Sequence, residues 1–106
     1  MRIILCGVGL MAGEPLRAYA EHRVLSWLGH LERELEVVTV QLWSESSEEG
    51  RRTRCRLLAR PVAGASPVVE ETSADDFDAI DRATERMASA LRLATRKRRR
   101  LALARV

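Results

Sequence analysis

The chain has 106 residues, 46% of them hydrophobic, which suits one compact domain with a modest core and excludes a disordered polypeptide. The formal net charge is +3, yet residues 92–106 carry seven positive side chains and no acidic one, which leaves residues 1–91 at −4. The basic character is therefore concentrated at the C-terminal end, and contact with phosphate is one function that fits it. Because no apolar segment is long enough to cross a bilayer, no membrane contact is expected.

The first residues predict a buried strand over 2–8, which we favour over a signal peptide, followed by a glycine turn. Residues 7–12 match the GxGxxA form of a dinucleotide-binding fingerprint, but that motif would place Pro15 inside its helix, at a cost of ~3 kcal/mol. Pro15 fits a first helical turn instead, so neither a dinucleotide nor another cofactor is expected. Cys6 and Cys55 lack metal-ligand spacing, which predicts reduced thiols, no metal site and a cytoplasmic protein.

Hydrophobic periodicity predicts the remaining elements. Apolar residues three and four apart are typical of a helix, and alternating apolar and polar residues are typical of a half-buried strand. The resulting order predicts an α+β fold, βαβββα, in which both helices cover one face of a four-stranded sheet. Strands one and two are expected to be parallel, and the others antiparallel. The predicted elements are a strand over 2–8, a helix over 15–31, strands over 37–44, 51–60 and 68–73, and a helix over 75–100.

The helix over 75–100 is the element around which the chain is organised. Acidic residues crowd its first turns and arginines its last turns, which is the order that the helix dipole favours. Ser73 and Asp76 form a candidate capping box at its start. Its apolar residues share one face that must lie against a core. The opposite face carries a column of four arginines, which are Arg82, Arg86, Arg96 and Arg100.

The face of the sheet that the helices leave open carries a second basic pattern. Pairing Ser44 with Arg51 across an acidic, mobile loop sets Leu42 opposite Thr53 and places Trp43 beside alternating arginines. Such a surface could hold phosphates and stack on a base. The arginines could equally pair with the acidic loop and serve only solubility, so both interpretations stay open. The arginines concerned are Arg52, Arg54 and Arg56.

These residues resemble a known family. The element order, Gly7 at the end of the first strand, the Leu16–Tyr19 opening of the first helix and above all residues 75–87 (DDFDAIDRATERM) are similar to the ribosome hibernation-promoting factors. That family is also called ribosome-associated inhibitor or sigma-54 modulation protein. The resemblance implies a βαβββα factor that binds small-subunit rRNA near the decoding centre. Residues 1–106 would form a single ribosome-binding domain, a short form, with a basic tail from about residue 96 that can fray.

The same resemblance implies translation regulation by occupancy, in which the factor blocks the messenger and transfer RNA sites during stress and in stationary phase. Arg23, Arg86 and Arg92 match positions where the family usually has lysine or arginine. Ser26 and Ser89 stand where a basic residue is common, which implies a weaker grip on phosphate and leaves room for a diverged role. The candidate rRNA-binding residues are Arg23, Arg52, Arg54, Arg56, Arg82, Arg86, Arg92, Arg96, Lys97, Arg98, Arg99 and Arg100.

An alternative function belongs to another class. Ile4, Cys6 and Trp43 on the open sheet face could form a patch for a homodimer or for a protein partner. A catalytic nucleophile, base and orienting group cannot be assembled from the two histidines and two cysteines, so neither an enzyme nor a small-molecule substrate is expected. An acylphosphatase-like enzyme shares the size range and a glycine-rich first loop, but it has a different element order.

Overall fold

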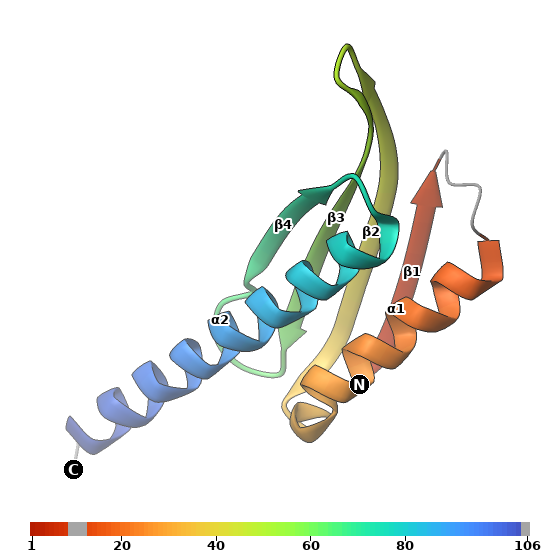
Figure 1. Ribbon diagram of the computed structural model, residues 1–106. Coiled ribbons are helices and arrows are strands. Elements are labelled where there is room, and N and C mark those ends of the chain that lie inside the picture. Colours follow the sequence, from red (N-terminus) through yellow and green to blue (C-terminus); the bar gives the residue numbers. More distant parts are fainter. Residues whose placement is uncertain (9–12, 105–106) are drawn as a thin grey trace.

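The computed structural model describes residues 1–8 and 13–104 and confirms the predicted order βαβββα (Figure 1). The first and fourth strands agree with the sequence prediction residue for residue. Residues 9–12 of the glycine segment lie outside the described residues, and the first helix begins at Gly13 with Pro15 in its first turn. The elements are β1 (Arg2–Val8), α1 (Gly13–Leu28), the 3₁₀ turn η1 (Gly29–Leu31), β2 (Leu35–Ser47), β3 (Gly50–Pro61), β4 (Val68–Ser73) and α2 (Asp76–Ala104).

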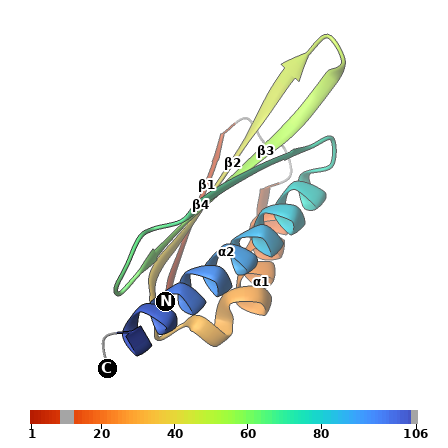
Figure 2. The same cartoon turned by 90° about the vertical axis from the view of Figure 1, so that its left-hand side faces the viewer.

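The four strands form one sheet in the order β1-β2-β3-β4. The strands β1 and β2 are parallel, as expected for strands joined through a helix, and the other two pairs are antiparallel. Both helices lie on the same face of the sheet, which leaves the other face open (Figure 2). The predicted architecture is therefore confirmed.

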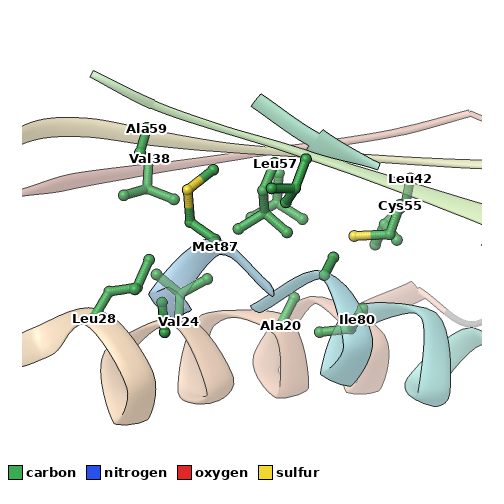
Figure 3. Close-up of a cluster of buried hydrophobic side chains, with 14 of the residues drawn as sticks. Ala20, Val24, Leu28, Val38, Leu42, Cys55, Leu57, Ala59, Ile80 and Met87 are labelled. Atoms are coloured by element: carbon green, nitrogen blue, oxygen red, sulfur yellow. The ribbon is translucent and has the colours of Figure 1, made fainter. Parts of the chain in front are cut away.

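The core lies between the sheet and the two helices. Figure 3 shows Leu57 and Cys55 of β3 pointing toward Ile80 and Met87 of α2, with Val24 of α1 beside them. Leu57, Cys55, Ile80, Met87 and Val24 are all 0% exposed. Burial raises the pKa of the Cys55 thiol to about 12, so this cysteine is an apolar packing group in the folded protein. The buried stripe of α1 repeats every four residues and comprises Leu16, Ala20, Val24 and Leu28.

The predicted pairing of β2 with β3 is wrong by two residues. Ser44 pairs with Thr53, where the sequence analysis paired it with Arg51, and Leu42 pairs with Cys55 rather than Thr53. The cause is the hairpin, because the strands continue until Ser47 pairs with Gly50 and leave only two residues in the turn. The acidic segment is thus mostly strand. A slip of two residues keeps each side chain on its predicted face, so the division into inner and outer faces is correct.

The helix ends also differ from their predictions. The predicted first helix runs to residue 31, but α1 ends at Leu28, the 3₁₀ turn η1 covers Gly29–Leu31, and Leu35 begins β2. At the start of α2, Asp75 Oδ1 accepts a hydrogen bond of 2.9 Å from the Phe77 N–H, which makes Asp75 the cap in place of the expected Ser73 and Asp76 box. The Ser73 hydroxyl instead donates to Asp78 Oδ2 at 2.8 Å.

The long helix α2 projects beyond the sheet (Figure 1). Its 29 residues span about 44 Å at the usual rise per residue. Leu91 is its last buried residue, and residues 92–104 are all partly or fully exposed. The helix nevertheless continues to Ala104, and the expected fraying from about residue 96 stays a prediction. In the described part of the chain, no helix is long and apolar enough to cross a membrane.

Candidate nucleic-acid interface

Arg23 on α1 is held by two carboxylates of α2. Its Nε lies 2.8 Å from Asp81 Oδ1, and its Nη2 lies 3.7 Å from Glu85 Oε1. The guanidinium also lies over the ring of Trp27, 5.7 Å from the centroid. Because only 25% of the Arg23 side chain is exposed, most of its surface is used within the protein. Arg23 thus joins the two helices, and a phosphate would have to compete with Asp81 for it.

Tyr19 shares the carboxylate that holds Arg23. Its hydroxyl donates a hydrogen bond of 2.6 Å to Asp81 Oδ1. This bond, with smaller contributions from desolvation and from the charge of Asp81, raises the pKa of Tyr19 above its usual value. The Tyr19 ring meets Phe77 edge to face, with centroids 4.9 Å apart. The interface between α1 and α2 is therefore built from Tyr19, Arg23 and Asp81 around an apolar contact.

We expect Arg23→Gln to lower the stability of the fold by about 1 kcal/mol, because it removes the Asp81 and Glu85 contacts and the packing on Trp27. The control is Arg82→Gln, which removes an exposed pair at i,i+4 and should cost about 0.3 kcal/mol. Urea unfolding of both variants measures the difference. If Arg23→Gln were as stable as the wild type, its pair with Asp81 would not support the structure and Arg23 would be available to a ligand.

On the open face, Arg54 is the centre of an ion-pair network. Its Nη2 lies 3.2 Å from Glu45 Oε2 and its Nη1 lies 3.1 Å from Glu70 Oε1. The guanidinium also lies 5.8 Å from the centroid of the Trp43 ring, whose Nε1 donates to Glu45 Oε1 at 3.2 Å. For Arg54, the structure therefore favours pairing with acidic neighbours. Arg52 and Arg56 on the same strand are exposed, and neither has a carboxylate within ion-pair distance among the described residues.

Three further arginines of α2 have partners within the chain. Arg82 Nε lies 3.0 Å from Asp78 Oδ2 of the same helix. Arg86 Nη1 donates to the Glu70 carbonyl at 3.2 Å and lies 3.3 Å from Glu71 Oε1, so it fastens the helix to β4. Arg98 Nη1 donates to the Ala63 carbonyl at 3.1 Å. Arg86 and Arg98 therefore help to hold α2 in place, and all three guanidiniums keep some N–H groups for other partners.

The remaining cations of α2 lie on its projecting part. Among the described residues, none of them has a carboxylate within ion-pair distance, and all are exposed. Arg92 makes one short-range contact, a hydrogen bond of 3.0 Å from its Nη2 to Ser89 Oγ. We call this group the tail cations: Arg92, Arg96, Lys97, Arg99 and Arg100. A phosphate that contacts these side chains would release counterions without breaking an internal ion pair.

A groove runs between the tail cations and the start of β2. It has a volume of about 340 Å³ and is lined on the α2 side by Arg92, Arg96 and Arg99. The opposite side is lined by His30 of η1 and by Glu34. Leu91 is buried and Leu31 is half-buried, so the polar and charged residues form the rim. The arrangement can accept an anion along one side of α2.

The alternative partner patch is partly engaged by contacts within the chain. Cys6 is exposed, whereas Ile4 and Trp43 are half-buried. The indole N–H of Trp43 is already bonded to Glu45, and Arg54 covers part of its ring. A shallow hollow beside it is lined by Cys6, Gln41, Leu42 and Trp43. The patch is thus a partly satisfied polar surface with a small apolar component.

Neither a protein-family model nor a curated protein matches the sequence. Solved structures do match the fold. The N-terminal domain of Protein Y from Thermus thermophilus superposes with a TM-score of 0.69 at 27% identity, over 85% of this chain and 94% of that domain. A ribosomal subunit interface protein from Coxiella burnetii superposes with a TM-score of 0.77 at 14% identity, over 90% of this chain and 98% of that one. The resemblance to the ribosome hibernation-promoting factor family is confirmed.

The positions carried over from the hibernation-promoting factor family divide into two groups. Arg23 and Arg86 are engaged with carboxylates of the same chain, whereas Arg92 and the cations after it have none within ion-pair distance in the described residues. Sequence reasoning missed Asp81, His30 and Glu34. The spacing of charges along one helix cannot reveal them, because Asp81 pairs with Arg23 of α1, and His30 and Glu34 come next to α2 only in the folded chain. The role of every arginine toward RNA stays a prediction.

Proposed function

We propose that this protein associates with ribosomes and inhibits translation by binding rRNA of the small subunit near the decoding centre. The observation that carries the proposal is the projecting part of α2, which presents five tail cations without carboxylate partners among the described residues. Support also comes from the two matching structures, one named a ribosomal subunit interface protein and the other Protein Y. Under this proposal the protein is a cytoplasmic factor of stress and stationary phase.

The proposed mechanism is occupancy without catalysis. The protein is 56 Å in its longest dimension, and the projecting part of α2 forms a rod that carries its charges in fixed positions. When the rod lies against RNA, each phosphate contact releases counterions and adds affinity. The bound domain would then exclude messenger and transfer RNA from the same place. No cofactor and no small-molecule substrate enter this mechanism.

Co-sedimentation of the purified protein with small ribosomal subunits tests the proposal. Five phosphate contacts give a slope of about −4 for log K against log salt, so affinity should fall about two orders of magnitude between about 50 and about 200 mM salt. Large ribosomal subunits at the same concentration are the control and should retain much less protein. Absence of binding to small subunits at the lowest salt would overturn the proposal.

A homodimer or protein partner at Ile4, Cys6 and Trp43 is the competing proposal. It has less support, since Trp43 is engaged by Glu45 and Arg54 within the chain. The same preparation distinguishes the two. A tight dimer that does not bind ribosomes at low salt would favour the partner patch, and a monomer that binds them in a salt-sensitive way would favour RNA.

A further inference from the structure

His30 is one of only two histidines in the chain, and it lines the groove beside the tail cations. Arg92, Arg96 and Arg99 line the same groove from α2, spaced four and three residues apart. Side chains at this spacing share one side of a helix and follow one another at about 6 and 4.5 Å along its axis. A single anion seated in the groove could therefore meet two guanidiniums and the imidazole.

The charges around His30 come from three parts of the chain. The α2 side supplies Arg92, Arg96 and Arg99, and the segment after η1 supplies Glu34 in the same groove, with exposed Glu32 and Arg33 next to it. The amino group of Met1 donates to the Glu32 carbonyl at 3.3 Å. An imidazolium at position 30 would add a fourth positive charge opposite the three guanidiniums. A phosphate held by those guanidiniums attracts a proton to His30, and by linkage the proton strengthens the binding of phosphate.

We infer that the groove between η1 and α2 binds a phosphodiester of RNA together with a proton on His30. This inference rests on the proposed function and adds a regulation to it: binding tightens as the pH falls. Histidine is the side chain whose charge ordinarily changes between about pH 5 and 8, so the test compares affinities within that range. A phosphodiester keeps its single negative charge over this range, which leaves the protein as the source of any pH dependence.

The test measures the affinity of the full chain for a short labelled RNA duplex by fluorescence anisotropy, at constant ionic strength, from pH 7 to pH 5.5. Above pH 5.5 glutamate side chains are generally ionised, so the carboxylates contribute little to the change. We expect the wild type to bind about threefold to tenfold more tightly at the lower pH, which is the effect of up to one linked proton. His30→Gln should lose most of this tightening between pH 7 and pH 5.5, so the ratio of its two affinities should lie close to one.

The other histidine provides the matched control. His22 is exposed on α1 and does not line the groove, so His22→Gln should keep the tightening of the wild type. Equal tightening in His30→Gln and the wild type would overturn the inference, as would a pH-independent wild type or a loss confined to His22→Gln. If the wild type binds neither this RNA nor small subunits at pH 7, the proposed function itself fails and the inference with it.

Discussion

Changing Arg92, Arg96, Arg99 and Arg100 to alanine together is expected to reduce the affinity for small ribosomal subunits by about a hundredfold or more at low salt. These side chains are exposed and, among the described residues, have no carboxylate within ion-pair distance, so phosphate contacts to them carry no cost of breaking internal pairs. The slope of log K against log salt should become shallower by about 3. The stability of the fold should change little, since exposed side chains away from special contacts contribute little to it.

A second variant separates the position of the charges from their number. This variant changes Arg2, Arg17, Arg33 and Arg60 to alanine. It removes as many positive charges as the first variant, so the net charge falls from +3 to −1 in each of the two variants. All four residues are exposed and lie outside α2. We expect this control to keep most of the affinity and nearly the full salt slope. Equal losses in the two variants would mean that net charge, rather than the projecting helix, drives the association.

A third comparison concerns the open face of the sheet. Arg52 and Arg56 are exposed there, while Arg54 between them is paired with Glu45 and Glu70. A variant with Arg52 and Arg56 changed to alanine, measured in the same co-sedimentation salt series, shows whether β3 contributes phosphate contacts. A slope like that of the wild type would mean that Arg52 and Arg56 make no phosphate contacts.

Local sequence patterns were sufficient to predict the layers of the fold. Alternation along β2 and β3 determined which residues face the helices, since burial on one face requires a period of two. The register was predicted wrongly because the two turn positions hold Glu48 and Glu49, whereas asparagine or glycine usually marks a two-residue turn. The glycine of this hairpin, Gly50, follows the turn with a φ of +119°, a conformation that favours glycine.

Whether each arginine forms an ion pair within the chain was harder to predict than the fold. Arg82 and Asp78 are four residues apart, so their pair can be inferred from helix geometry alone. The carboxylates that hold Arg23 and Arg54 come from other elements, Asp81 of α2 in one case and Glu45 and Glu70 of neighbouring strands in the other. Only the packing of α1 on α2 and the true register bring these groups together. The groove with His30 and Glu34 depends in the same way on where α2 passes η1.

Leu93→Pro is expected to reduce binding to small subunits nearly as far as the loss of the four tail arginines, although it removes no charge. Proline inside a helix loses one hydrogen bond and clashes with the preceding turn, so the rod should break near this residue. Leu93 is 64% exposed and follows the last buried residue, Leu91. The cost to global stability should therefore stay at about 1 kcal/mol or less, because the segment beyond the break can unfold locally instead.

Leu93→Ala is the matched control, since it removes the same exposed side chain and leaves the helix intact. It should bind and unfold like the wild type, while circular dichroism of Leu93→Pro should show the loss of helix from the projecting part of α2. Subunit co-sedimentation across the salt series then compares a rigid row of cations with a flexible one of equal charge. Wild-type affinity in Leu93→Pro would show that the basic residues act as an unstructured tail, and the occupancy mechanism would lose its rigid rod.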